Sequence, residues 1–499
     1  METLFYRLLD DNRLKRSMNI LEMLYKARQT VEISEMEERL RVSQKTVYSA
    51  LDYVKTLLPD TATLVVTDKQ VWIEQSDPTH TIEDYIIEIA KTTIQYRLLR
   101  HLFYHGEMDI CEVADLMYLS ESTLRKRIRH INKVLSVFRL RISFSDVQLK
   151  GDETDIRYFF YEYFSEFQEL FISVCKEKLA HFTSLYQKLR KSLKPYEEKP
   201  LHYSYQQITR WLFLMNDRMA QNCFVQVKKE LAAHIKTRPS YRVFKVVYEA
   251  EMAHALKKPI PEAEVIWAYI VAFNSIVYTD NPNVGLFQDE ADIAPLKKEL
   301  GMILGDVAQK LRLRTEDQES FIATHSAYLI NLSMLLELSP VFQIGYDPVQ
   351  NFALQNLERL YIVWTKCLDH LKAESLIPIS NVHSVGTQLA MISSQFFYNQ
   401  KTQAKTVLYS FEGEAGLPAY LEALAKSLLP KGVEGVFITD RPIDEKLIQS
   451  VKPDIFVCNY VLPLAPIGCR ILRMAHVPLM QEWTMLREMI ISRDGMAYC

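Results

Sequence analysis

Apolar residues recur at helical spacing along most of this 499-residue chain, and this pattern predicts a mainly helical protein. Near the start, "SMNILEMLYKA", "ISEMEERLR" and "SQKTVYSALDYVKTLL" each show one apolar stripe, which predicts three consecutive helices. The β-rich run "TLVVTDKQVWIE" follows and turns at Asp68-Lys69, which predicts a hairpin. Three helices and a β-hairpin are typical of a winged helix-turn-helix, and we call this stretch the first repeat.

The same order of elements recurs downstream, in what we call the second repeat. "TTIQYRLLRHLFYHG", "DICEVADLMYL" and "SESTLRKRIRHINKVLSVF" predict three helices, and "LRISFSDVQLKGDE" predicts a hairpin around Ser145-Asp146. Both third helices begin at a serine, Ser43 or Ser120, which is a favoured N-cap residue. The sequence therefore predicts two successive winged helix-turn-helix repeats.

The pattern changes near residue 400. Between the second repeat and that point the chain is nearly all helical, and the segment "FNSIVYTDNPNVG" divides it into two predicted bundles. After residue 400, the pattern predicts strands at "KTVLYSF", "VEGVFITD", "DIFVCNY" and "HVPLM", which alternate with helical segments. Such alternation predicts a small parallel α/β domain at the end of a multidomain, mainly α chain.

The third helix of the second repeat has two faces of opposite character. Leu124, Ile128, Ile131 and Leu135 form its apolar stripe. The opposite side, which we call the basic arc, consists of Ser122, Arg125, Lys126, Arg129 and Lys133. Only Glu121 offsets these bases, whereas a solvated helix usually mixes charge signs. Because a third helix in this position can enter the major groove, we favour DNA binding over a solvated face, with Arg139 and Arg141 of the hairpin adding contacts.

The corresponding helix of the first repeat is less basic. Its exposed side carries Lys45, Tyr48, Ser49 and Asp52, and Gln44 and Ser49 are the candidates for polar contacts to bases. These residues fit either polar contacts to DNA or a packing role, and the sequence does not choose between the two.

Composition limits the class of protein. The 59 Lys+Arg and 62 Asp+Glu give a net charge of −3, so any nucleic-acid binding must use local patches. Seven cysteines, without a C-x-x-C pair, fit a reducing cytoplasm. The longest apolar stretch, "IFVCNYVLPLAPIGC", is too short for a membrane span and contains two prolines. We therefore expect a cytoplasmic protein without membrane association.

The order of elements resembles that of the Mga/AtxA family of bacterial virulence regulators. The likeness extends over essentially the whole chain and rests on domain order together with "ISEMEERLRVSQKTVYSALDYV" and "DICEVADLMYLSESTLRKRIRHIN". It implies promoter DNA and the phosphocarrier protein of the sugar phosphotransferase system (PTS) as partners, and a homodimer formed through the last domain. The implied domains are two helix-turn-helix domains, two PTS regulatory-like helical domains and an EIIB-like α/β domain, at residues 1–78, 79–155, 156–285, 286–400 and 401–499.

In such regulatory domains the PTS phosphorylates histidines, a reaction that needs an accessible, neutral imidazole. The candidates are His202, His325 and His383, and each fits equally a structural histidine at a helix boundary. An active EIIB carries its cysteine in the loop after the first strand. Here that loop, "YSFEGEAGLP", has no cysteine and contains Glu412 and Glu414, which would repel phosphate. We therefore expect an inactive EIIB relative that serves as an interaction surface.

Motifs for nucleotide binding, metalloprotease or serine-hydrolase chemistry are absent from the sequence, so we predict no catalytic site, cofactor or metal. The leading hypothesis is a DNA-binding transcriptional regulator tuned by histidine phosphorylation. The alternatives are an RNA-binding antiterminator and a PTS-linked interaction protein. For the homodimer, Trp483, Met485, Leu486 and Met489 lie on or near one helix face, which fits an interface or packing onto the domain's own sheet.

Overall fold

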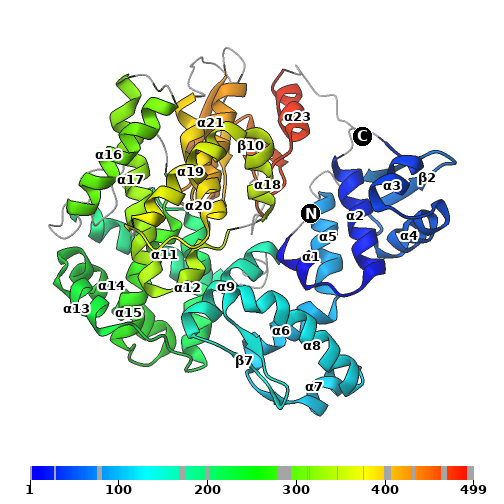
Figure 1. The fold of residues 1–499 in the computed structure, drawn as a ribbon, viewed down its shortest axis with the longest axis horizontal. Helices are drawn as coiled ribbons and strands as arrows, with labels where there is room; N and C mark the ends of the chain where they lie inside the picture. Colours follow the sequence, from blue (N-terminus) through cyan, green and yellow to red (C-terminus); the bar gives the residue numbers. More distant parts are fainter. Residues whose placement is uncertain are drawn as a thin grey trace. The chain divides into compact units, whose positions relative to one another are not determined.

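A computed structural model describes residues 3–26, 30–75, 81–167, 176–196, 202–278, 294–311, 313, 315–345, 347–374, 376–397, 406–429, 433–461 and 469–491. The chain divides into two compact units (Figure 1). Unit 1 comprises Met1–Gly151, Glu162–Phe167 and Ile471–Cys499. Unit 2 comprises Asp152–Tyr161 and Gln168–Arg470. The protein is mainly helical, as the apolar periodicity predicts.

The first repeat lies in unit 1 and has three helices and three strands. These are α2 (Asn12–Lys26), β1 (Val31–Glu32), α3 (Ile33–Leu40), α4 (Gln44–Leu57), β2 (Ala62–Val66) and β3 (Gln70–Gln75). The strands form an antiparallel sheet in the order β1-β3-β2, and Val66 pairs with Val71 across the expected turn. The apolar stripe of α4 is buried, with Val47 and Val54 at 0% exposure.

The second repeat has the same plan. Its elements are α6 (Ile94–His105), β4 (Met108–Asp109), α7 (Ile110–Leu116), α8 (Glu121–Leu135), η1 (Ser136–Phe138), β5 (Arg141–Ile142), β6 (Asp146–Val147) and β7 (Leu149–Lys150). Strand β4 precedes α7 and pairs with β6, just as β1 precedes α3 and pairs with β3. The turn between the second and third helices holds one left-handed residue in each repeat, Arg41 (φ 53°) and Tyr118 (φ 57°).

The segment predicted as one hairpin around Ser145-Asp146 forms three short strands that belong to two different sheets. β5 pairs with β7, whereas β6 pairs with β4 instead of with either neighbour. The hydroxyl of Ser143 donates to the backbone and the carboxylate of Asp146, and this local bonding replaces ladder pairing at the tip.

The described part of unit 1 contains three further helices: α1 (Leu4–Leu8), α5 (Ile82–Lys91) and α23 (Met480–Ile491). Helix α9 (Glu153–Phe167) contributes its last residues to this unit. The apolar face of α23 is already used inside the chain, because Trp483 and Leu486 are each only 3% exposed. Of the four tail residues expected near an interface, Met489 is partly exposed and Met485 is 52% exposed.

Unit 2 contains the helical region. Among the described residues before the C-terminal strands, its remaining helices are α11 (Lys176–Leu193), η2 (Lys194–Tyr196), α12 (Tyr205–Ala220), α13 (Lys229–Thr237), α14 (Pro239–Leu256), α15 (Glu262–Val271), η3 (Ala272–Ser275), α16 (Ala294–Lys310), α17 (Thr315–Leu338), η4 (Pro340–Gln343), α18 (Asp347–Asn356), α19 (Glu358–Ala373), α20 (Val382–Ser394) and η5 (Gln395–Phe397). Helices α16, α17, α19 and α20 pack together (Figure 1). Most of the segment expected to divide two bundles lies outside the described residues.

Helix α17 is apolar enough to resemble a membrane span over Asp317–Leu338. However, 72% of the most apolar window in that stretch is buried inside the protein, as expected for the central helix of a folded bundle.

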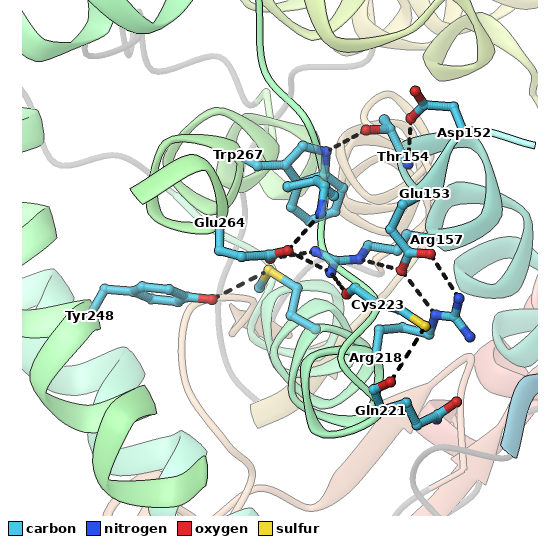
Figure 2. A network of polar contacts seen from close by, with 12 residues as sticks. Asp152, Glu153, Thr154, Arg157, Arg218, Gln221, Cys223, Tyr248, Glu264 and Trp267 are labelled. Carbon is cyan, nitrogen blue, oxygen red and sulfur yellow. Dashed lines mark hydrogen bonds and ion pairs between the residues drawn. The ribbon is translucent and has the colours of Figure 1, made fainter. Parts of the chain in front are cut away.

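A buried cluster of four charges joins α9, α12 and α15 (Figure 2). Arg157 lies 2.7 Å from Glu264, and both side chains are fully buried. Glu153 lies 3.0 Å from Arg157 and 2.7 Å from Arg218, so two acids balance two bases. Trp267 donates to the Thr154 hydroxyl beside the cluster. Because every charge has a partner of opposite sign, the cluster fixes these three helices in register without an unpaired buried charge.

The C-terminal strands form a four-stranded sheet in the order β11-β10-β8-β9, as the alternation of strands and helices predicts. Its elements are β8 (Thr406–Ser410), α21 (Leu417–Leu428), β9 (Glu434–Phe437), α22 (Glu445–Val451), β10 (Ile455–Cys458) and β11 (Arg470–Arg473). β8 pairs in parallel with both β9 and β10. The expectation of a strand at "HVPLM" is wrong, because the strand is "RILR" and Pro478 lacks the N–H that a ladder needs.

Candidate DNA-binding surface

Helix α8 is fixed at its start and along its apolar face. The Ser120 hydroxyl accepts a hydrogen bond from the Thr123 amide, which makes Ser120 the N-cap that the sequence indicates. Ser43 occupies the same position in the first repeat, but its hydroxyl bonds the Thr46 side chain instead of an amide. The predicted apolar stripe is confirmed, since Leu124, Ile128, Ile131 and Leu135 all have 0% exposure.

The basic arc covers the opposite side of α8. Ser122, Lys126, Arg129 and Lys133 are exposed, whereas Arg125 is half-buried. Arg125 pairs with Glu121 one turn earlier, at 2.6 Å between guanidinium and carboxylate. Three cationic side chains therefore face solvent from a helix whose other side is fixed in the core.

Two basic residues of α8 outside the arc have structural partners within unit 1. Arg127 lies 2.6 Å from the carboxylate of Asp10, and His130 Nε2 lies 3.0 Å from the Arg7 carbonyl oxygen. Both partners lie near α1, so these contacts attach α8 to the N-terminal segment. The sequence places Arg127 and His130 beside the apolar stripe, but it does not identify Asp10 as a partner.

The segment after α8 is attached to the helix through one side chain. Asn132 donates from Nδ2 to the Ile142 carbonyl (2.9 Å) and accepts from the Ile142 amide (2.6 Å). Arg139 and Arg141 are exposed beyond this attachment. Lys150 lies 2.9 Å from Asp146, so its charge is offset locally. Hydrogen bonds from Ser145 and Lys150 hold the pKa of the Asp146 carboxyl well below its usual range.

The corresponding helix α4 presents a weaker surface. Gln44, Lys45 and Ser49 are exposed, as the sequence indicates. Tyr48 is half-buried, and its hydroxyl donates to the Asp68 carbonyl at the turn of the β2–β3 hairpin (3.4 Å). Tyr48 is therefore tied to the hairpin of its own repeat.

The three candidate histidines differ in access. His325 has 0% exposure; its Nδ1 donates to the Phe321 carbonyl (2.7 Å) and its Nε2 lies 2.9 Å from the Ser393 hydroxyl. Burial lowers the pKa of His325 to about 4, so its ring is neutral at physiological pH. His202 is half-buried, and His383 is exposed at the start of α20 with Nδ1 2.6 Å from the Tyr361 hydroxyl.

The loop after β8 is closed by contacts within unit 2. Glu412 is 3% exposed and pairs with Arg210 of α12 at 3.1 Å. The Glu412 amide also donates to the Asn459 side chain (2.7 Å), and the Gly416 amide donates to Gln388 of α20 (2.7 Å). A methyl group added at Gly416 would lie 2.6 Å from the Gln388 carbonyl oxygen, so the loop and α20 are in close contact.

Among the residues that the structure describes, no group of three or more His, Cys, Asp or Glu could hold a metal ion. The five cysteines of the described ranges are free thiols.

Residues 78–164 match the family described as the Mga helix-turn-helix domain. The capsule synthesis positive regulator AcpB of Bacillus anthracis is 19% identical over 498 residues, which cover 97% of this chain and 99% of AcpB. AcpA, a second capsule synthesis positive regulator of that organism, is 20% identical over 425 residues, 81% of this chain and 83% of its own. A Streptococcus pneumoniae serotype 4 protein, named as a candidate trans-acting regulator, is 31% identical over 152 residues, or 30% of each chain.

The helix-turn-helix domain and the similarity to AcpB and AcpA over most of the chain define the class of the protein as a transcriptional regulator. Within that class, the matched domain and the similarity to AcpA and AcpB are those of a regulator of the Mga/AtxA type.

Proposed function

We propose that this regulator binds duplex promoter DNA with α8. The observation that carries the proposal is the exposure of Lys126, Arg129 and Lys133 on a helix that is capped at Ser120 and buried along its other face. A rigid helix of this kind places its cations at fixed positions, which suits contacts to phosphates and to guanine edges in the major groove.

The neighbouring candidates extend this surface. Ser122 at the start of α8 and Arg125 in its second turn belong to the same arc, and Arg139 and Arg141 would reach backbone phosphates beside it. The polar residues of α4 would make a secondary contact, because Lys45 is the only basic residue among Gln44, Lys45, Tyr48 and Ser49.

We further propose that the PTS phosphocarrier protein modulates this regulator by phosphorylating a histidine in unit 2. Phosphoryl transfer requires an imidazole nitrogen that a donor protein can approach. His383 is exposed and His202 is partly exposed, whereas both nitrogens of His325 are engaged in the core. His383 is therefore the first candidate and His202 the second. A role with this partner also implies a cytoplasmic protein.

The α/β domain is proposed to be an EIIB relative without chemistry of its own. Its first loop lacks a cysteine and holds Glu412 against Arg210, which supports a domain that does not carry a phosphoryl group. We propose that this domain forms the homodimer contact. We also propose that the chain has the five domains given above. The buried Trp483 and Leu486 of α23 would not form that contact.

The direct test is a fluorescence anisotropy titration with labelled duplex fragments from the protein's own genome, in competition with RNA hairpins. We expect duplex DNA to compete and RNA hairpins not to compete. Lys126→Ala, Arg129→Ala and Lys133→Ala together should weaken duplex binding. A matched control removes three exposed lysines of α16, namely Lys297, Lys298 and Lys310. Stronger competition by RNA would favour an antiterminator, and equal losses in both variants would contradict a role for α8.

A further inference from the structure

An aromatic ring from the segment after α8 lies beside the basic arc. The centroid of Phe144 is 5.9 Å from the guanidinium carbon of Arg125 and 5.9 Å from that of Arg129. Cations within about 6 Å of a ring centroid are attracted by the negative face of the aromatic system. One ring therefore contacts two arginines that are one helical turn apart.

The position of this ring is itself fixed. Asn132 of α8 holds both the amide and the carbonyl of Ile142, two residues before Phe144. Ile142 is 1% exposed, so this stretch is fixed in the core as well as by hydrogen bonds. Phe144 is only half-buried. Core packing alone does not require an aromatic ring that is half exposed to solvent on a fixed segment. This ring lies beside the two arginines.

We propose that Phe144 is a positioning residue for DNA recognition, which holds the guanidinium groups of Arg125 and Arg129 in the orientation that meets the duplex. This inference rests on the proposed DNA-binding function of α8. Arginine loses considerable side-chain entropy when it is ordered, so an arginine that is held in place beforehand binds more tightly and with better-defined geometry. The ring would thus add affinity and sequence discrimination without touching DNA.

The contacts on either side support this assignment. Glu121 holds the Nε side of Arg125 at 2.7 Å, while the ring lies near its guanidinium group, so this arginine is restrained from two directions. Among the described contacts, Lys126 and Lys133 of the same arc have no cation–π contact with Phe144. The two lysines therefore provide an internal control, because loss of the ring should leave their contribution unchanged.

The test is a double-mutant cycle measured by anisotropy with a duplex that the full-length protein binds. Phe144→Leu should weaken binding by about 5- to 30-fold, the factor for two cation–π contacts of ordinary strength. Phe144→Tyr keeps the ring and should stay within about twofold of the parent protein. In the Arg125→Ala/Arg129→Ala background, Phe144→Leu should change affinity by less than about twofold. In the Lys126→Ala/Lys133→Ala background it should keep its full effect.

Three outcomes separate the possibilities, provided that thermal melting shows each variant to be folded. An equal loss from Phe144→Leu with and without the two arginines would mean that the ring acts by another route, and would overturn the proposal. No loss from Phe144→Leu, while the arginine variant binds weakly, would overturn it too. If the arginine variant and the Lys126/Lys133 variant both bind normally, the proposed function of α8 fails, and this inference fails with it.

Discussion

His325 should make the stability of the helical region depend on pH. Its ring is fully buried, stacks on Trp364 with a centroid distance of 4.9 Å, and has both nitrogens within hydrogen-bond distance of neighbours. Burial lowers its pKa to about 4, whereas an unfolded histidine titrates near 6.5. The unfolded chain therefore binds more protons between these values. The stabilising contribution is complete above pH 6.5 and is lost as pH falls towards 4.

The size of the effect follows from the two pKa values. The difference between a pKa of about 6.5 in the unfolded chain and about 4 in the folded one corresponds to at most about 3.4 kcal/mol, and the part lost between pH 7 and pH 5 is about 2 kcal/mol. The assay is urea unfolding at both pH values, followed by tryptophan fluorescence, to which Trp364 beside the ring contributes. His325→Gln has no group that titrates in this range. We expect it to lower stability at pH 7 but to lose about 2 kcal/mol less than the parent protein on acidification.

A core substitution without a titratable group serves as the control. Ile392 is fully buried in α20 next to Ser393, and Ile392→Val should cost about 1 kcal/mol equally at both pH values. If His325→Gln has the same pH dependence as the parent protein, His325 does not titrate as its burial requires. The argument that burial makes His325 a weaker phosphorylation candidate than His383 would then be refuted.

Three other predictions follow from particular contacts. Transfer of labelled phosphate from the phosphocarrier protein should be reduced by His383→Ala and retained by a folded His325→Gln; the reverse pattern would contradict the proposed order of candidates. In unit 1, burial raises the pKa of Glu83 to about 7, so the ionised carboxylate destabilises the folded state increasingly as pH rises from 4.5 through 7. Glu83→Gln should therefore raise the melting temperature at pH 7.5. The expected gain in the free energy of unfolding is about 1–3 kcal/mol after allowance for the partial exposure of the side chain. Arg157→Met should destabilise unit 2 by about 3–5 kcal/mol because Glu264 is left buried and unpaired, and adding Glu264→Leu should restore much of that loss in chemical denaturation.

The features that local sequence determines could be predicted from sequence. The stripe of Leu124, Ile128 and Ile131 follows helical periodicity, and the cap at Ser120 depends only on the residues that follow it. The basic arc follows from the same periodicity, because once the buried side of α8 is known the exposed side is known as well. The parallel sheet could also be predicted, because strands that alternate with helices along the chain usually pair in parallel.

Features that depend on contacts distant in sequence could not be predicted in this way. Helix α17 is apolar on most sides, so its periodicity does not show that His325 lies at the centre of the bundle. The pairing of β6 with β4, instead of with β5, depends on how the second repeat folds back on itself. The position of Phe144 beside Arg125 requires the attachment of Ile142 to Asn132, which no spacing in the sequence reveals.

The most direct test of the central claim is the salt dependence of duplex binding by the full-length protein. Each phosphate contact that is lost should reduce the slope of log affinity against log salt concentration by about 0.9. If Lys126, Arg129 and Lys133 each contact one phosphate, their joint replacement by alanine should reduce the slope by about 2.7. The control without Lys297, Lys298 and Lys310 of α16 should keep the parent slope. An unchanged slope and affinity in the folded α8 variant would show that DNA is not bound by this helix.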